Sequence, residues 1–387
     1  MGQIVGVGTA TAPIPGAGDE VRVTASQTVL MGHLVLGRLR VNMTLNGEGL
    51  TMPNGEPTIG SWGEGFVDRR HPHTYLHEVM ASWVQPLGGT AAASLSAGKG
   101  FVAFGSDDPM VRPLQRYPVN HHLAQILERF TAIAGVRTSV GTVEASLFNG
   151  DEPETPAQWP RIARFGDSWA VRATAAPFRH TSVQASHARV RSPEHRPGAG
   201  TDQRKWSVSA RHQVNGRGRT GRYLLAEWAR TSEAGGFFNF SSLLAEGALT
   251  RGAVLLSYRV ERTDRPEEER LPDDAFRSAR PHLENAILGT TRFVLQTVHL
   301  EHQVRRGPWR ISPFVEVTLG SLRRQGATGV FDPAVFYGGT SIRTLSAGAR
   351  LAVGPAMWRM GRYGVVAPLM ASMASPPDDL PHEEHDP

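Results

Sequence analysis

The sequence contains no cysteine and almost no lysine. The absence of cysteine excludes disulfide bonds, thiol chemistry and Cys-ligated zinc. Lys99 and Lys205 are the only lysines among 41 basic residues, so arginine carries nearly all of the positive charge. These arginines are spread singly along the chain rather than gathered in one basic patch. The net charge of +5 therefore does not indicate nucleic acid as a partner.

Long hydrophobic runs are also missing. No stretch of about 20 apolar residues occurs, so we expect no transmembrane helix. The first 18 residues lack a basic segment, and the apolar run 28–37 continues directly into an alternating segment, so we expect no signal peptide in this sequence. No G-x-x-x-x-G-K-[ST], G-x-S-x-G or H-E-x-x-H motif is present, and chance explains the esterase-like Gly-Asp-Ser at 166–168, so we predict neither a cofactor nor catalytic residues.

What the sequence does contain is a two-residue period repeated along most of its length. In 34–46 and 253–263, for example, apolar residues alternate with arginine, glutamate, serine, threonine or asparagine. Such alternation predicts strands, because successive side chains of a strand point to opposite faces. About fourteen segments of this kind lie between residues 33 and 353, separated by connections rich in the 42 glycines and 27 prolines. The segment 121–134 is compatible with either a helix or a strand.

The charged face of these strands decides where they can lie. A charged side chain facing lipid at mid-depth costs about 2–4 kcal/mol, so in a membrane the charged face must enclose water. The sequence thus predicts an all-β fold: a single antiparallel up-and-down transmembrane β-barrel of about 14 strands, with 12 to 16 also compatible. We expect residues 1–27 to form an extended leader, 28–365 the barrel, and 366–387 a disordered, acidic, proline-rich tail.

A barrel of this kind predicts a channel whose lumen is lined by arginine and glutamate. An arginine-rich constriction favours anions electrostatically. The lumen residues that we predict from the alternation are Arg38, Arg40, Arg172, Arg211, Arg259, Glu227 and Glu316.

The densest group of potential metal ligands lies at 68–78 (DRRHPHTYLHE). His71, His73 and His77 share one face of a strand because their offsets are even. Three imidazoles on one face suit zinc or copper, so a metal-binding or metal-handling protein is a second hypothesis. Local hydrogen bonding of these histidines in a polar segment is the simpler alternative.

A long connection between strands suggests a further site. Asp107 and Asp108 precede Pro109, and His121 and His122 follow on the same connection, which places carboxylates and imidazoles in one loop pocket. Asp108 and His122 are candidate acid and base groups for a third hypothesis, a barrel enzyme that acts on lipid or glycan. A turn capped by aspartate and ended by proline explains the same Asp-Asp-Pro segment without chemistry.

Several stretches resemble a family of uncharacterised bacterial outer-membrane proteins that are porin-like barrels. They are 63–77 with its D-R-x-H-P-H segment at 68–73, 148–153 (FNGDEP), 165–169 (FGDSW) and 188–194 (ARVRSPE). The resemblance implies an outer-membrane barrel without a settled substrate. Our leading hypothesis is a monomeric porin-like channel or transporter in the bacterial outer membrane, with membrane lipid and small solutes or ions as its partners.

Overall fold

The computed structural model describes residues 2–11, 22–25, 29–47, 50, 73–153, 155–193, 195–215, 220–268, 287–326, 331–336, 339–354 and 360–367. This part of the chain is almost entirely β-structure, with a few short 3-10 helices and the four-residue helix α2 (Pro333–Phe336). Within it, no helix has the length and apolar character needed to cross a bilayer, a finding that does not concern strands.

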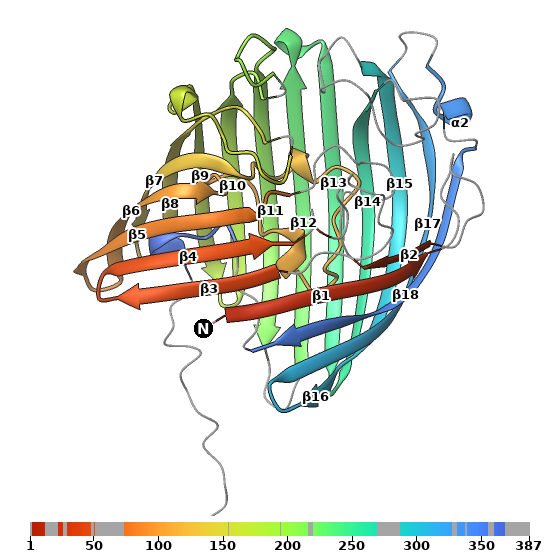
Figure 1. Cartoon of the computed structure of the whole chain (residues 1–387), viewed down its shortest axis with the longest axis horizontal. Coiled ribbons are helices and arrows are strands. Elements are labelled where there is room, and N and C mark those ends of the chain that lie inside the picture. Colours follow the sequence, from red (N-terminus) through yellow and green to blue (C-terminus); the bar gives the residue numbers. More distant parts are fainter. Residues whose placement is uncertain are drawn as a thin grey trace, which may run out of the picture.

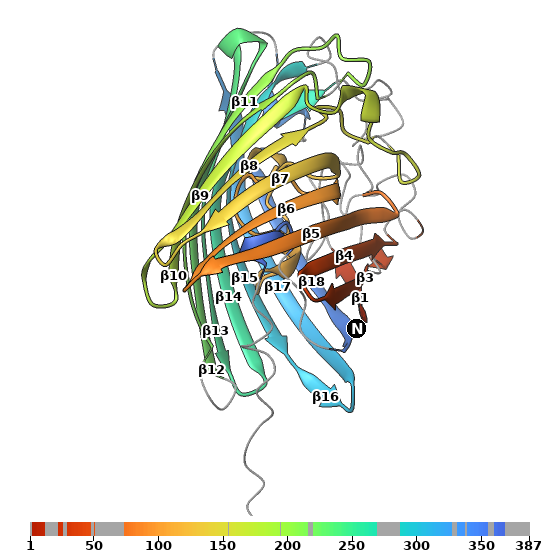
Figure 2. The ribbon, with the colours of Figure 1, turned by 90° about the vertical axis from the view of Figure 1, so that its left-hand side faces the viewer.

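The strands form one closed ring of antiparallel neighbours. Each strand pairs with the next along the chain, and β1 pairs with both β18 and β3, so the ladder returns to its start (Figure 1). The ring consists of β1 (Gly2–Thr11), β3 (Val29–Leu36), β4 (Leu39–Asn46), β5 (Leu76–Gly88), β6 (Ala91–Gly100), β7 (Arg129–Arg137), β8 (Gly141–Phe148), β9 (Ser168–Phe178), β10 (Thr181–Val190), β11 (Gln203–Asn215), β12 (Thr220–Glu233), β13 (Phe238–Arg251), β14 (Val254–Glu268), β15 (Ile287–His302), β17 (Trp309–Gln325) and β18 (Ser341–Val353). Two short strands, β2 (Arg22–Ala25) and β16 (Val304–Arg306), pair with β1 and β17. In Figure 2, β5 to β9 run obliquely across the wall.

The predicted all-β, up-and-down architecture is confirmed, but the ring has sixteen strands where the alternation predicted about fourteen. One extra strand arises because 33–46 is a hairpin rather than one strand: Gly37, with φ of 59°, lies in the turn between β3 and β4. The other is β1, which lies inside the predicted leader 1–27. Its sequence, GQIVGVGTAT, is rich in glycine and lacks charged residues, so it carries little of the signal that marked the other strands.

The connections differ between the two ends of the barrel. At one end, which we call the turn end, β5–β6, β9–β10 and β13–β14 are joined by two-residue turns. The connections at the other end, the loop end, are mostly much longer, and they include 101–128 and 149–167. This asymmetry is typical of outer-membrane barrels.

The outer face of the wall is apolar. Large hydrophobic side chains are exposed there at every second position of the strands: Trp83, Leu95, Leu147, Val171, Leu224, Trp228, Leu256, Val298, Val315 and Leu345. The intervening residues point inward and are mostly polar or charged, as the alternation predicted. A surface that exposes so many large apolar groups suits lipid, because the hydrophobic effect opposes their contact with water.

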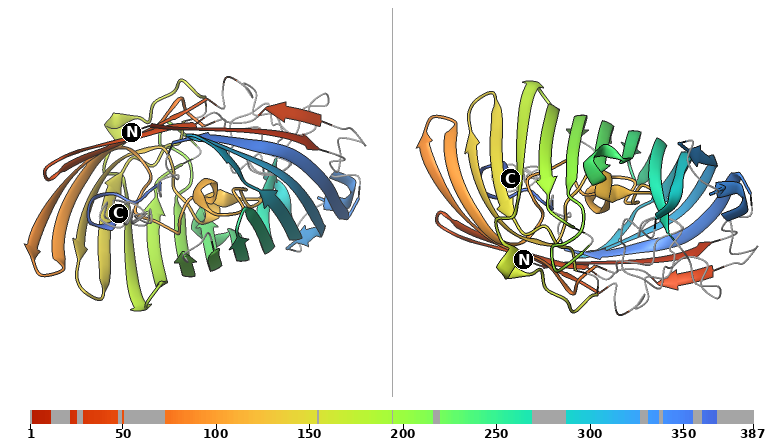
Figure 3. Two further views of the ribbon diagram at one scale, coloured as in Figure 1. Left: turned by 90° about the horizontal axis from the view of Figure 1, so that it is seen from below. Right: turned by 90° about the horizontal axis from the view of Figure 1, so that it is seen from above.

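The interior of the barrel is filled by two segments of the chain. The connection 101–128, which we call the internal loop, folds back between β6 and β7 into the ring (orange in Figure 3). Residues 360–367, which we call the C-terminal segment, also lie inside the ring (blue in Figure 3). The residues of both segments are mostly buried, and none of them is fully exposed.

Apolar contacts attach the internal loop to several parts of the wall. Phe101, Met110 and Tyr117 belong to a buried cluster that includes residues of β3, β5, β7, β17 and β18. Phe104 packs in a second cluster with residues of β8, β9 and β10, and Leu123 in a third with residues of β12 and β13. The loop is therefore a core element of the barrel rather than a surface connection.

Candidate functional site

The local fold of the internal loop follows from a few side chains. Asp108 accepts a hydrogen bond from the Met110 backbone N–H (2.7 Å) and caps the 3-10 helix η1 (Pro109–Val111). Gln125 Nε2 donates to the other carboxylate oxygen of Asp108 (3.1 Å). The backbone N–H of Val102 donates to the carbonyl of Ile126 (3.0 Å), so the two arms of the loop lie side by side at its base.

Glycine is required where these arms meet. Gly105 has φ of 68°, and a Cβ atom built there would lie 1.7 Å from the carbonyl oxygen of Ala124. Its N–H donates to Ser186 Oγ on β10 (2.9 Å). Any side chain at residue 105 would separate the two arms or push the loop from the wall.

Charged groups of the internal loop pair with carboxylates of the wall. Arg112 Nη2 lies 3.2 Å from Glu227 Oε2 on β12, and Ser106 Oγ also donates to that oxygen. Further round the ring, Arg116 pairs with Glu316 on β17 and donates to Thr318 Oγ1 (2.6 Å). Both predicted lumen glutamates thus face inward, and both are almost completely buried by the loop.

Arginines of the wall make the reverse contacts. Arg172 on β9, Arg259 on β14 and Arg350 on β18 each donate to a backbone carbonyl of the internal loop, at 3.4, 2.7 and 2.7 Å. Each also pairs with a carboxylate on a strand of the wall, namely Glu144, Glu246 and Glu301. The predicted lumen residues Arg172 and Arg259 therefore point inward, but they are buried in ion pairs rather than exposed to a water-filled space.

The other three predicted lumen arginines have different positions. Arg211 on β11 faces inward, with Nη1 3.0 Å from Asp107 Oδ2 of the loop. Arg40 is half-buried on the inward side of β4, opposite Ser82 of β5. The position of Arg38 differs from the predicted one. It lies exposed in the β3–β4 turn and donates to Gln85 Oε1 at 2.5 Å. A hairpin turn, not a mid-strand position, carries this residue, so it does not line the lumen.

The C-terminal segment locks against the internal loop. Arg362 Nε lies 3.1 Å from Asp107 Oδ1, and Tyr363 Oη donates to Glu78 Oε2 on β5 (2.7 Å). The same Tyr363 hydroxyl accepts the N–H of Phe101, at 3.0 Å. Burial, together with the negative charge of Glu78, raises the pKa of Tyr363 well above its usual value, so this hydroxyl stays a donor.

Part of the predicted histidine cluster meets the base of the loop. His73 and His77 lie with ring centroids 5.0 Å apart, and His77 Nδ1 donates to Glu128 at 2.8 Å. His71 lies outside the described residues, so the three-histidine metal site stays a prediction. Among the residues that the structure describes, no group of three or more histidine, aspartate or glutamate side chains is arranged to hold a metal ion.

Glu128 anchors the base of the internal loop to β5. One of its oxygens accepts from the Thr74 N–H (2.9 Å), from Thr74 Oγ1 (2.6 Å) and from His77. Burial by itself would raise the pKa of Glu128, but the hydrogen bond and charge of His77 and the charge of Lys99 hold it below its usual value. Because the folded pKa is depressed, this anchor is fully present above the unfolded pKa of about 4.3 and is lost as pH falls through the folded pKa.

We therefore predict that Glu128→Gln destabilises the folded barrel by about 1–3 kcal/mol at pH 7, because buried donors lose a charged acceptor. The check is the temperature at which the compact band disappears in a heat-modifiability gel. The deficit should shrink as pH falls from the unfolded pKa of about 4.3 toward the folded pKa, because wild-type Glu128 loses its charge-dependent stabilisation over that range. An equal deficit at every pH would show that the charge of Glu128 is not what anchors the loop.

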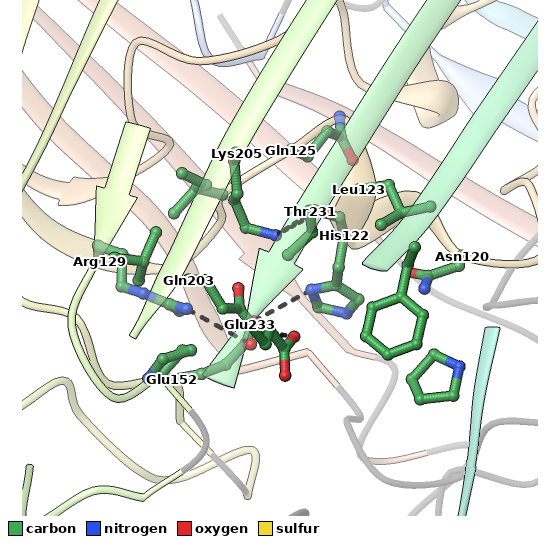
Figure 4. Close-up of a pocket in the computed structure, with 15 residues that line it drawn as sticks. Asn120, His122, Leu123, Gln125, Arg129, Glu152, Gln203, Lys205, Thr231 and Glu233 are labelled. Carbon is green, nitrogen blue, oxygen red and sulfur yellow. Dashed lines mark hydrogen bonds and ion pairs between the residues drawn. The ribbon is translucent and has the colours of Figure 1, made fainter. Parts of the chain in front are cut away.

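A polar pocket lies between the internal loop and the wall at the loop end (Figure 4). Its volume is about 60 Å³. Glu152 lies between His122 and Arg129, with its oxygens 3.6 and 3.4 Å from their nitrogens. Lys205 Nζ donates to Thr231 Oγ1 (3.0 Å), and Gln203 Nε2 donates to Glu233 Oε1 (2.6 Å). Positive and negative groups are balanced here, which suits a small polar solute or a few waters.

The four residues predicted to form one loop pocket do not gather in one place. His122 lines the loop-end pocket, whereas Asp107 faces Arg211 and Arg362 nearer the turn end. Asp108 is occupied as a cap, and the ring of His121 lies against that of Tyr117 (4.5 Å). Asp108 and His122 therefore do not form the acid and base pair of the third hypothesis.

Sequence reasoning missed the wall positions that receive the loop. Met80, Phe148, Phe240 and Phe314 are buried on the inward face, where the alternation led us to expect polar residues. Large apolar residues on the otherwise polar face were a usable signal. They mark where the interior is packed rather than wet.

Comparisons with known proteins agree with the barrel architecture. No protein-family model matches the chain, and no curated protein matches it in sequence, so the family built on the D-R-x-H-P-H segment has no support from either. Among solved structures, OprB of Pseudomonas putida is 12% identical, with a TM-score of 0.51 over 91% of this chain and 93% of that one. An anion-selective porin from Comamonas acidovorans is 12% identical over 91% and 98% of the chains (TM-score 0.47). A loop-deletion mutant of OmpT, an outer membrane protein of Vibrio cholerae, is 9% identical over 91% of this chain and 98% of that one (TM-score 0.47). At 12% identity the likeness to OprB shows the fold alone, and the chain has the fold of an outer-membrane porin.

Proposed function

We propose that the protein is a gated, porin-like channel for small solutes in the bacterial outer membrane, closed in this structure by the internal loop. The observation that carries the proposal is the set of buried contacts between the charged inner wall and that loop. Arg112 with Glu227 and Arg116 with Glu316 are ion pairs between two parts that share no strand.

Three arginines of the wall support this proposal because they do not need the loop to balance their charges. Arg172, Arg259 and Arg350 pair with carboxylates on strands of the wall, so displacement of the loop would expose neutral, hydrated pairs. An empty ring of sixteen strands is wide enough for an aqueous channel. The loop is the part whose movement decides between a closed and an open barrel.

Charge suggests which solutes pass. The loop-end pocket is balanced in sign, but nearer the turn end the described lining has Arg137 and Arg211 on the wall and one carboxylate, Asp107 of the internal loop. A constriction with excess positive charge favours anions. We therefore expect small anions to pass through the channel more readily than cations.

Planar-bilayer recording of the purified full chain tests the proposal. We expect small, intermittent conductance steps at low voltage and a reversal potential of anion-selective sign in a salt gradient. A steady, large conductance from the first insertion would contradict a closed lumen. A cation-selective reversal potential would contradict the proposed charge of the solutes, but it would not contradict closure of the channel by the internal loop.

A further inference from the structure

A second cavity lies on the turn-end side of the internal loop. Its volume is about 270 Å³, and it is enclosed by the wall from β7 to β12, by the start of the loop and by the C-terminal segment. It occupies the turn-end half of the lumen, since Arg137 is the last residue of β7 and Ser182 the second residue of β10. On the loop side, Ser106 lines it, and hydrogen bonds hold Gly105 to β10 and Ser106 to β12.

Four polar atoms of this cavity have no hydrogen-bond partner within the described part of the protein. They are Thr142 Oγ1, Thr174 Oγ1, Gln184 Nε2 and Tyr223 Oη. Gln184 and Tyr223 are more than nine-tenths buried. Buried polar groups are nearly always hydrogen-bonded, so four unpartnered groups around one cavity point to a ligand that supplies the partners.

The orientation of the Gln184 side chain supports the presence of such a ligand. Ser209 Oγ donates to Gln184 Oε1 at 3.0 Å, which fixes the carbonyl side of the amide against the wall. The amide NH₂ group is then the part that is presented as a donor. The guanidinium of Arg211 lies 5.7 Å from the ring centroid of Tyr223, so the ring is held in place where Tyr223 lines the cavity.

The charge of the cavity selects the class of ligand. Among the described residues, Arg137, Arg211 and Arg362 line it together with one carboxylate, that of Asp107, whose two oxygens pair with Arg362 and Arg211. Arg137 is held by a hydrogen bond to the Val365 carbonyl, at 3.2 Å. Two positive charges therefore remain in excess, beside a row of hydroxyl and amide groups.

The volume of the cavity suits a ligand larger than the simplest anions. A water molecule takes about 30 Å³ of liquid, so 270 Å³ holds a molecule of several carbon atoms rather than one inorganic ion. We propose that this cavity is a binding site for a small hydroxylated carboxylate of the sugar-acid type. Its carboxylate would meet the arginines, and its hydroxyl groups would meet Thr142, Thr174, Gln184 and Tyr223. The inference rests on the proposed function, since it names the solute that such a channel would hold.

Calorimetric titration of the full chain, folded in detergent, with gluconate tests the site without any need for conduction. We expect gluconate to bind at least tenfold more tightly than sorbitol, which lacks the charge, and than hexanoate, which lacks the hydroxyl groups. Tyr223→Phe and Thr174→Val should each weaken gluconate binding about fivefold, the usual value of one hydrogen bond. Neither substitution should lower thermal stability, because each removes a group that the protein leaves unpartnered.

Thr291→Val is the matched control. Thr291 Oγ1 is another buried, unpartnered hydroxyl on the inner wall, but it does not line this cavity. Its loss should leave gluconate binding unchanged. Equal affinity for gluconate and sorbitol, no binding of gluconate in the millimolar range, or equal weakening by Thr291→Val would overturn the site. Binding without conduction would instead count against the channel and leave the site intact.

Discussion

Excision of the tip of the internal loop is expected to open the barrel. Val102 and Ile126 are hydrogen-bonded across the base, and Gly105 lies against Ala124, so residues 106–123 can be replaced by a short Gly-Ser linker without spreading the arms. The excision removes Arg112 and Arg116 together with their contacts to the wall. Single-channel conductance should rise on the order of tenfold, because a ring of sixteen strands is wide enough for an aqueous channel once the tip of the loop is gone, even with the C-terminal segment still inside it.

The control for this excision is a change that spares the lumen. Arg38→Ala removes an exposed arginine of the β3–β4 turn and should leave conductance unchanged. The excised chain should still migrate as a compact, heat-modifiable band, because the wall arginines keep their pairs with wall carboxylates. Unchanged conductance in a correctly folded excised chain would mean that the internal loop is not what closes the lumen.

The sequence predicted the wall well and its contents poorly. A strand with one apolar and one charged face can be recognised from its own sequence, and β9 and β14 could be located from alternation. The direction of each face also followed, since a charge cannot lie against lipid at mid-depth. The hairpin at Gly37 and the strand β1 were missed because a turn in an apolar run and an uncharged, glycine-rich strand leave the pattern almost unchanged.

The candidate site was beyond local reasoning for a different reason. Arg112 and Glu227 are 115 residues apart, and nothing near either residue tells that they meet. From the sequence alone, Arg112 is a charged residue in a loop and Glu227 a charged residue on the lumen face of a strand. The pairing depends on the path of the internal loop across the ring, which is a property of the whole barrel. Inward aromatic residues such as Phe148 and Phe240 indicate that something fills the lumen, but not which segment does so.

The pair Arg112–Glu227 gives the sharpest test of the gate. Both side chains are almost fully buried, and the ion pair joins the loop to β12. Removal of one partner leaves the other charge buried and unpaired, which costs about 3–5 kcal/mol of folding free energy. Glu227→Leu and Arg112→Met should therefore each lower the gel transition temperature and raise the fraction of time that the channel conducts.

The double variant separates a gate from general damage. With both charges gone, no uncompensated charge remains, and a buried pair replaced by apolar groups is often neutral in stability. The double variant should thus recover most of the thermal stability and most of the closed time, so the losses of the two single variants should be strongly non-additive in the mutant cycle. Arg189 and Asp202 form the matched control, an ion pair of 2.8 Å that is largely exposed near the loop end. Its cycle should give less than about 1 kcal/mol and no change in conductance, because solvent screens an exposed pair. If the Arg112 and Glu227 variants destabilise the barrel additively, with no recovery in the double variant, their charges act independently and the pair does not hold the gate.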